Sequence, residues 1–527
     1  MLPCRKVQGF SHVYRRTLSL NLPYPLNITG PRVCRHYGTD LGPAPTGTLA
    51  DELSGSLRGI VPRFSLAADR IQILHSPTEF YRTLLSNIEH AQRRIFLSTL
   101  YIGKTEHELV EQIRRSLERH PHLRVSILTD ALRGTRERPQ PSCASLLVPL
   151  VEQFGQDRVD IRMYHTPNLT GLRKAILPKR INEGWGLQHM KLYGTDDEIM
   201  LSGANLSSDY FSDRQDRYQS FQSTALADYY HRIHQAVGEL SFRVLPDRVE
   251  GFKLDWPTSN KAPSPLEKPR EFRVRGAATL GPLIQPSQSA AISNQQDAVT
   301  DTSVYPIAQF SQMFGADDKS TELPAVSRLL TTLIRPRQEQ SSWTFTAGYF
   351  NIHPDLASLL LNAGSEHGTV ITASPWANGF YGSKGISGLL PGAYTLLLRR
   401  FMRRVEARKK QARIRLLEWR RGTVGELGGW TYHAKGIWIG QGEENGPCAT
   451  VIGSSNYTKR SYQLDLEVGA VIVTNNADLK QRLGAEVQNL QRHAKVTELA
   501  ELEGGERRVG IRVRVAMWLV KILGGAL

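Results

Sequence analysis

The sequence predicts an α/β protein of two similar halves, each a mixed, largely parallel sheet flanked by helices, with the active site between them. Three observations predict this fold class. A strand–helix–strand order occurs twice, a linker-like stretch separates the two occurrences, and the same polar motif ends each of them. The 527 residues suffice for two or three domains, and a hydrophobic content of 40% is typical of a globular protein.

The first 37 residues have the composition of a mitochondrial transit peptide. They carry six arginines or lysines, which contribute +6 to the net charge of +16, and no acidic residue. A disordered basic N-terminus is the alternative. No compact apolar stretch follows the charges, which disfavours a secretory signal. Removal of residues 1–37 would leave residues 38–67 as an N-terminal extension.

Residues 68–249 are predicted to form the first half. Residues 93–103 have the pattern of a buried strand, residues 108–119 space their apolar side chains as a helix does, and residues 125–130 form a second strand. A strand, a helix and a strand in this order indicate a parallel pair with a crossover helix.

The second half is predicted over residues 304–495 and repeats this order. Residues 343–351 match the first strand and residues 369–375 the second, with a helix between them that starts near Pro354. Residues 250–303 are rich in Pro, Ser and Gln, which predicts a partly disordered linker between the halves.

Two basic segments are candidates for membrane contact. Residues 399–421 carry eleven arginines or lysines among apolar side chains, and residues 496–527 form a basic amphipathic tail. The first segment could equally pack on the second half. The tail could equally form a strand, because apolar and basic residues alternate after Gly510. No apolar run is long enough for a transmembrane helix.

A polar motif of the form H-x-K, followed by an aspartate, a G-[SA]-N-like turn and a second acid, occurs in both halves. In the first half its residues are His189, Lys191, Asp196, Asn205 and Asp216. In the second half they are His433, Lys435, Ser454, Asn456 and Glu467, with Gly440 where the first aspartate is expected. Two unrelated surface histidines are the alternative, but the equal order and the equal Asn-to-acid offset favour a repeated functional motif.

The motif predicts chemistry at a phosphodiester. A histidine and a lysine two residues apart on a strand point to the same face, so joining the halves gathers two imidazoles, two ammoniums and two amides. Such donors suit the non-bridging oxygens of a phosphodiester, while one histidine attacks phosphorus and the other moves protons. We expect Asp216 and Glu467 to orient the rings. We expect no metal and no other cofactor, since Cys143 and Cys448 alone remain after processing and form no zinc motif.

The motif resembles the phospholipase D superfamily, whose pattern His189, Lys191 and Asp196 match in full. Within it, FYRTLLSNIEHAQRRIFLSTLYIG, FTAGYFNIHP and IGSSNYTKRSYQLDLE are similar to mitochondrial phosphatidyltransferases that use CDP-diacylglycerol. The resemblance implies transfer of a phosphatidyl group from CDP-diacylglycerol to sn-glycerol 3-phosphate with release of CMP. This is the committed step toward phosphatidylglycerol and cardiolipin.

The resemblance also implies roles for the motif residues. His189 would form a phosphohistidine and His433 would act as base. The implied catalytic set is His189, Lys191, Asp196, His433 and Lys435, and the implied phosphate-binding set is Asn205, Asn456 and Ser454. Candidates for the phosphate of the acceptor are Arg214, Arg217, Lys459 and Arg460, each of which could instead be an ordinary surface charge.

The expected partners are the two substrates and the anionic surface of the mitochondrial inner membrane, on its matrix side. Neither nucleic acid nor a required protein partner is expected. The alternatives are a phospholipase D-type cardiolipin synthase, a phosphodiesterase acting on nucleic-acid ends, and a membrane scaffold without activity. Charge concentrated in two segments argues against nucleic acid, and two intact H-x-K pairs argue against lost activity.

Overall fold

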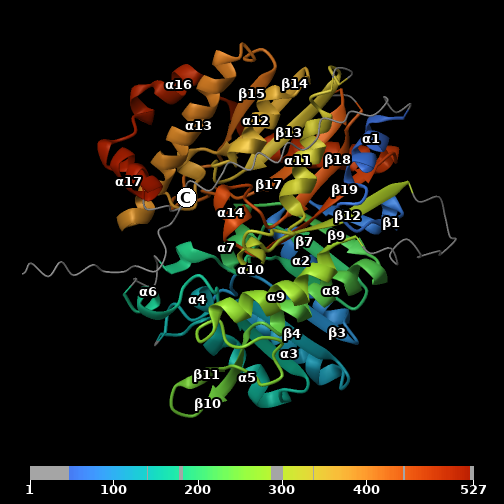
Figure 1. Cartoon of the computed structure of the whole chain (residues 1–527), viewed down its shortest axis with the longest axis vertical. Helices are drawn as coiled ribbons and strands as arrows, with labels where there is room; N and C mark the ends of the chain where they lie inside the picture. Colours follow the sequence, from blue (N-terminus) through green and yellow to red (C-terminus); the bar gives the residue numbers. More distant parts are fainter. Residues whose placement is uncertain are drawn as a thin grey trace, which may run out of the picture.

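Two nine-stranded sheets organise the described part of the chain (Figure 1). The computed structural model describes residues 47–138, 140–176, 182–286, 301–335, 338–442 and 445–522. The predicted transit peptide, residues 1–37, lies outside the described residues.

The two sheets share one strand order. The first runs β11 (Gly251–Asp255), β10 (Phe242–Asp247), β5 (Val159–Tyr164), β4 (Arg124–Asp130), β3 (Arg94–Ser98), β6 (Leu192–Thr195), β7 (Glu198–Ser202), β9 (Tyr218–Gln222), β2 (Ile71–Leu74). The second runs β20 (Ala494–Val496), β15 (Ile414–Trp419), β14 (His367–Ala373), β13 (Ser341–Ala347), β17 (Lys435–Gln441), β18 (Pro447–Gly453), β19 (Glu467–Thr474), β12 (Thr302–Gln309), β1 (Phe64–Leu66). Eight consecutive strands correspond from β10 and β20 onward, which confirms the prediction of two similar α/β halves.

Parallel pairing is confined to the middle of each sheet. The parallel pairs are β3–β4, β4–β5, β13–β14 and β14–β15. These are two of the eight neighbour pairs in each sheet as described, so the sheets are mixed, but the expectation that they are largely parallel is wrong. The reason is that β6–β7 and β17–β18 are hairpins, and short turns join antiparallel strands.

The strand–helix–strand units form where the sequence predicts them. Helix α3 (His107–Arg119) joins β3 to β4, and α12 (Pro354–Asn362) joins β13 to β14. Pro354 is the first residue of α12, where the missing N–H of proline leaves no helical hydrogen bond unmade. Leu109, Ile113 and Leu117 recur every four residues and are buried, which holds α3 against the first sheet.

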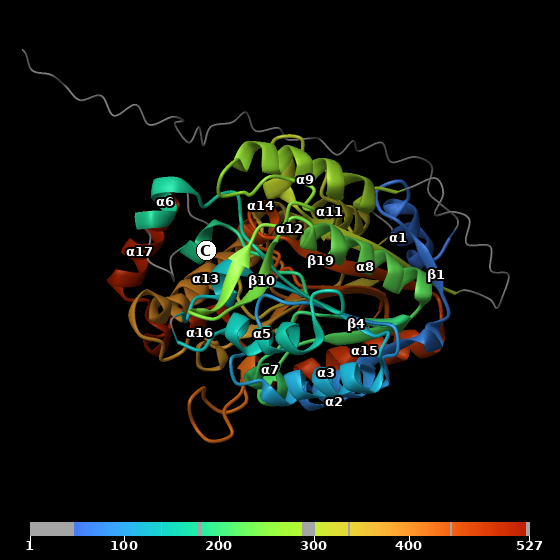
Figure 2. The ribbon, with the colours of Figure 1, turned by 90° about the horizontal axis from the view of Figure 1, so that it is seen from below.

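Further helices cover both sheets. They include α1 (Leu49–Leu57), α2 (Pro77–His90), α4 (Ala131–Gly134), α5 (Cys143–Phe154), α6 (Gly171–Ile176), α7 (Ser208–Ser212), α8 (Thr224–Gly238), α9 (Pro269–Ile284), α10 (Ser311–Phe314), α11 (Glu322–Thr332), α13 (Leu390–Ala407), α14 (Lys459–Gln463), α15 (Ala477–Gln491), α16 (Leu499–Glu503) and α17 (Ile511–Ile522). Figure 2 shows α2 and α3 on one side of the molecule and α9 on the opposite side.

Residues 250–303, predicted to be a linker, contain regular elements. Strand β11 pairs with β10 at the edge of the first sheet, and α9 packs against α8 and α10. Phe272 and Leu280 of α9 are fully buried. A few apolar residues at helical spacing therefore outweigh the Pro- and Ser-rich composition. Residues 287–300 lie outside the described residues.

The described part of the N-terminal extension packs on the second half. Helix α1 contacts α11, and β1 pairs antiparallel with β12. Leu53 and Leu57 of α1 belong to the same buried cluster as Phe345 of β13. The described chain therefore starts on the second half, crosses to the first at β2 and later returns.

The large apolar side chains of residues 399–421 face the core. Phe401 and Val405 lie on α13 and Trp419 lies on β15, and all three are at most 4% exposed. The alternative that residues 399–421 pack on the second half is therefore confirmed. Their large apolar side chains are buried and do not form a membrane-contact surface.

The C-terminal tail is helical, so the strand alternative is wrong. Val509 and Val513 recur at helical spacing and pack with Ala393 of α13, while β20 already occupies the edge of the second sheet. Among the described residues we find no helix with the length and apolar content needed to cross a bilayer.

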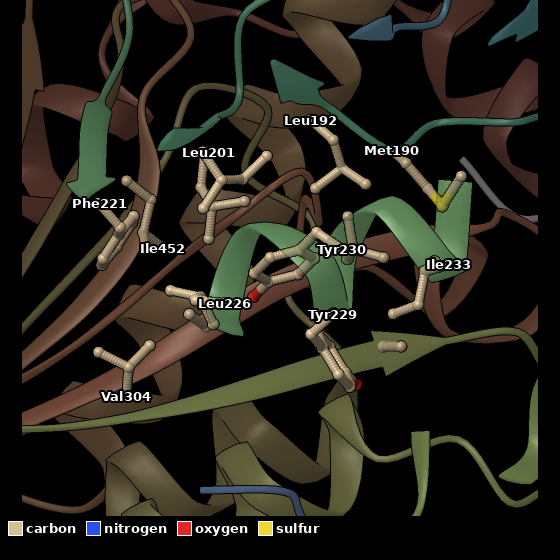
Figure 3. Packing of buried hydrophobic residues seen from close by; sticks show 14 of the residues in the cluster. Met190, Leu192, Leu201, Phe221, Leu226, Tyr229, Tyr230, Ile233, Val304 and Ile452 are labelled. Atoms are coloured by element: carbon tan, nitrogen blue, oxygen red, sulfur yellow. The ribbon is translucent and has the colours of Figure 1, made fainter. Parts of the chain in front are cut away.

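The two sheets share a core in which α8 lies. Figure 3 shows Tyr230 of α8 near Leu192 and Leu201 of the first sheet, with Val304 and Ile452 of the second sheet in the same cluster. Because this buried cluster draws on both sheets, it is continuous across the two halves.

Candidate active site

Each half holds the H-x-K segment of the other by a backbone hydrogen bond. The His189 N–H donates to the Leu466 carbonyl oxygen (2.9 Å), and the His433 N–H donates to the Gln215 carbonyl oxygen (2.8 Å). Leu466 and Gln215 each directly precede the trailing acid of their half. Each histidine is therefore placed beside the acid of the opposite half.

The histidine–acid pairs are crossed between the halves. His189 Nδ1 lies 2.9 Å from Glu467 Oε2, and His433 Nδ1 lies 2.6 Å from Asp216 Oδ2. A carboxylate that accepts from Nδ1–H fixes the tautomer and orientation of the ring and leaves Nε2 for a substrate. The sequence predicted acids beside both rings and left their pairing open.

Both imidazoles are neutral near pH 7 in the substrate-free site. Burial and the charge of Lys191 hold the pKa of His189 well below its ordinary value. Burial and the charge of Lys435 do the same to the pKa of His433. A neutral ring has the Nε2 lone pair that a nucleophile or a general base needs.

The two acids differ in charge state. Burial raises the pKa of Glu467 to about 7. Burial acts on Asp216 as well, but the charges of Lys435 and His433 outweigh it and hold the pKa of Asp216 below its ordinary value. His433 therefore faces a fully ionised partner, and His189 a partly protonated one.

Ser454, which is predicted to bind phosphate, contacts Glu467. Its side chain is fully buried, and Oγ donates to Glu467 Oε2 at 2.5 Å. The equivalent residue of the first half is Gly203, where a Cβ would lie 2.5 Å from Asp216 Oδ1. The serine hydroxyl therefore supports the carboxylate of Glu467, and phosphate binding by Ser454 stays a prediction.

The two lysines are buried beside their histidines. Lys191 Nζ donates to the His189 carbonyl oxygen (2.6 Å) and Lys435 Nζ donates to the His433 carbonyl oxygen (2.8 Å). Both lysines are 1% exposed, and burial lowers the pKa of Lys191 to about 7 and that of Lys435 to about 8. A bound phosphodiester would favour their charged forms.

The asparagines lie at the turns that follow β7 and β18. Asn205 is 4% exposed, and its Nδ2 donates to Tyr210 Oη (3.1 Å), while within the described ranges its Oδ1 has no partner. Asn456 is half-buried, and its N–H donates to Ser461 Oγ (3.3 Å). Phosphate binding by Asn205 and Asn456 stays a prediction.

Asp196 lies outside the site, which corrects its prediction as a catalytic residue. In the β6–β7 turn its carboxylate accepts from the backbone N–H groups of residues 92–94 at 2.9–3.0 Å. Five strand residues beyond Lys191 amount to about 16 Å. The absence of an acid at Gly440, which lies at an irregularity of β17–β18, therefore says nothing against catalysis in the second half.

The four basic candidates for the acceptor phosphate have unlike positions. Arg217 is fully buried and forms two hydrogen bonds with Glu486, both 2.9 Å long, so its predicted role is wrong. The side chains of Arg214 and Arg460 are 15% and 27% exposed, and each pairs with an aspartate. Lys459 is exposed at the start of α14.

Two tyrosines that the sequence interpretation missed surround His433. The rings of Tyr210 and Tyr349 stand edge-on to the imidazole with centroids 5.2 and 5.3 Å away, and Tyr210 Oη lies 3.4 Å from His433 Nε2. The sequence held a signal for Tyr349, because the first strand segment of each half carries a tyrosine near its end, at Tyr101 and Tyr349.

Comparisons with known proteins bear on the family and the fold of the chain. No family model matches the chain. The chain is 43% identical over 510 residues to the CDP-diacylglycerol–glycerol-3-phosphate 3-phosphatidyltransferase of Saccharomyces cerevisiae, which covers 95% of this chain and 96% of the relative. It is 34% identical over 493 residues to the mitochondrial enzyme of that name from Homo sapiens, over 88% and 85% of the two chains.

A solved structure supports the fold alone. The phosphatidylserine synthase of Haemophilus influenzae superimposes with a TM-score of 0.67 and 22% identity, covering 90% of this chain and 98% of the other. The sequence identities and their coverage decide the family. The chain belongs to the CDP-diacylglycerol–glycerol-3-phosphate 3-phosphatidyltransferases.

Proposed function

We propose that this chain transfers the phosphatidyl group of CDP-diacylglycerol to sn-glycerol 3-phosphate, giving phosphatidylglycerophosphate and CMP, through a phosphohistidine. Membership of the family supports the overall reaction. The observation that carries the mechanism is the crossed pairing of two neutral histidines with two acids at one interface.

In the first step His189 Nε2 attacks the phosphatidyl phosphorus. The P–N bond forms, the P–O bond to CMP breaks, and the electron pair leaves with CMP. CMP leaves as a phosphate monoester whose second pKa is about 6, so it needs little protonation. Lys191 and Lys435, with the amides of Asn205 and Asn456, would hold the non-bridging oxygens.

In the second step the primary hydroxyl of glycerol 3-phosphate attacks phosphohistidine. His433 Nε2 takes the hydroxyl proton, the new P–O bond forms, and the P–N bond to His189 breaks. The ionised Asp216 stabilises the imidazolium that this proton creates. The difference between the two acids therefore favours His433 as the base and His189 as the nucleophile.

The test is CMP release from CDP-diacylglycerol with and without glycerol 3-phosphate. We expect acceptor-dependent release that His189→Ala abolishes, while His122→Ala, at an exposed histidine, leaves it unchanged. Denatured enzyme trapped after donor alone should carry phosphorus on the peptide with His189. Label on the peptide with His433 reverses the two roles, and CMP release without acceptor indicates a hydrolase.

We further propose that the protein works in the mitochondrion, as a peripheral protein on the matrix side of the inner membrane. The composition of residues 1–37 and the mitochondrial relatives support the organelle. Import of a fluorescent fusion with and without residues 1–37 tests this. A fusion that reaches the matrix equally well without them contradicts the role of the leader.

A further inference from the structure

An apolar surface lies at one end of the molecule, outside the catalytic site. It is formed by α6 of the first half and by α17 and the 3-10 helix η5 (Gly385–Leu389) of the second half. Figures 1 and 2 both place α6 and α17 at the same end. Six of the twelve exposed large apolar side chains among the described residues belong to these segments, and Tyr381 lies four residues before η5. We call these segments, from Tyr381 on in the case of η5, the end surface; its exposed apolar side chains are Leu172, Ile176, Tyr381, Ile386, Ile511, Val515 and Trp518.

Helix α17 carries two apolar rows, and only one of them packs on other described residues. Val513 and Met517 pack on α13. Ile511, Val515 and Trp518 lie on the other side of the helix and are 77%, 50% and 61% exposed. An apolar row with no partner in the described chain indicates a surface that something else covers.

The end surface carries positive charge alone. Residues 171–176, 381–389 and 507–522 contain no Asp or Glu. Arg512 and Arg514 alternate with the apolar row of α17 and are exposed. Apolar side chains among cations, without acids, are the composition that binds an anionic lipid surface, whereas protein interfaces carry a polar rim of mixed kind.

The end surface connects to the ring stack beside His433 through α13. On the second half, α13 follows η5, and its Tyr394 stacks on Tyr349 at 5.5 Å. Tyr349 is the ring that stands against His433. The second half thus connects η5 to His433 through α13 and two tyrosine rings.

We propose that the end surface docks on an anionic phospholipid bilayer, with α6 and α17 in the headgroup region. This inference rests on the proposed function in one respect, because a lipid donor explains why the docking surface connects to the ring stack beside His433. It assigns membrane contact to α6, η5 and α17 rather than to residues 399–421, whose apolar side chains are buried.

The test is flotation of the full chain with phosphatidylcholine vesicles that contain phosphatidylglycerol or lack it. Two double variants remove one feature each. The charge variant, Arg512→Gln with Arg514→Gln, removes two positive charges of α17. The α6 variant, Leu172→Ser with Ile176→Ser, removes the two exposed apolar side chains of α6. The control is Val249→Ser/Val274→Ser, at exposed positions outside the end surface. We expect the charge variant to lose about 30-fold in affinity for anionic vesicles, the α6 variant to lose binding as well, and the control to bind as wild type.

Equal vesicle binding by wild type and both variants overturns the docking surface. CMP release from a short-chain CDP-diacylglycerol dispersed in water separates this failure from failure of the proposed function. We expect both variants to release CMP from the dispersed donor at the wild-type rate. If wild type releases no CMP there while the variants still lose vesicle binding, the function fails and the docking surface stands. If the variants lose self-association and keep vesicle binding, the surface joins copies of the chain and the inference is wrong.

Discussion

At the residue scale, the site is asymmetric although the motif is repeated. An ionised Asp216 faces His433, and a Glu467 whose pKa burial raises to about 7 faces His189. The residues behind the two acids differ as well. Ser454 donates a hydrogen bond to Glu467, whereas Gly203 leaves room for the carboxylate of Asp216. The two histidines therefore have unlike carboxylate partners, which suits two different roles.

Replacing each acid by its amide should separate the two steps. Asp216→Asn removes the anion beside the base, so transfer to the acceptor should slow by roughly 10²–10⁴-fold while phosphohistidine still forms. Phosphoenzyme should then accumulate in rapid-quench experiments. Glu467→Gln is the matched variant and should slow phosphohistidine formation without accumulation. The reverse pattern would exchange the roles of the histidines.

The buried lysines should set the alkaline limb of the pH profile. Burial lowers the pKa of Lys191 to about 7 and that of Lys435 to about 8, so both lose their charge at lower pH than an ordinary lysine. As pH rises through 7 to 8 the free enzyme loses the charges that bind the donor phosphate, and kcat/KM should fall. The measurement is kcat/KM in detergent micelles, and a profile that stays flat to pH 10 contradicts this cause.

At the element scale, the H-x-K hairpin of the first half is tied down at its turn rather than at its site. Asp196 adopts a positive φ of 47° and accepts three backbone hydrogen bonds that join the β6–β7 turn to the start of β3. The aspartate of the motif therefore holds a strand whose other end carries the chemistry.

Asp196→Ala should lower stability without removing catalysis. The loss of these hydrogen bonds should cost about 1–3 kcal/mol in the free energy of unfolding, and kcat of the folded fraction should remain near wild type. Denaturant unfolding and kcat at low temperature measure the two effects. Asp69→Ala, at an exposed aspartate, is the control. A folded Asp196→Ala protein without activity would restore the residue to the catalytic set.

At the scale of the whole molecule, a buried ion pair joins the two halves behind the site. Arg217 of the first half is fully buried and pairs with Glu486 of α15, and its guanidinium stacks on Trp438 at 3.8 Å. The same guanidinium donates to the Val451 carbonyl oxygen (2.7 Å). This network fixes the relative position of the two H-x-K strands.

Glu486→Ala should destabilise the molecule by about 3–5 kcal/mol, because it leaves the charge of Arg217 buried without a partner. The control is Glu503→Ala, which breaks an exposed pair with Arg403 and should change stability by less than about 1 kcal/mol. Urea unfolding followed by fluorescence and by activity should give one coincident transition for the wild type. Separate transitions would mean that the halves do not share a core.

The repeat, the strand–helix–strand units and the two H-x-K pairs could be predicted from the sequence. These features depend on periodicity and spacing along the chain, which are local: apolar residues every four positions in α3, or a histidine and a lysine two residues apart. The equal offset from each asparagine to its acid was also visible in the sequence.

Which groups meet at the site depends on how the two halves pack. The crossing of His189 with Glu467 and of His433 with Asp216 depends on backbone bonds between the halves, over more than 200 residues of chain. The same holds for the exclusion of Asp196 and for the apolar row of α17 that stays uncovered. Contacts across two packed domains are set by how the sheets dock, and no spacing along one strand records that.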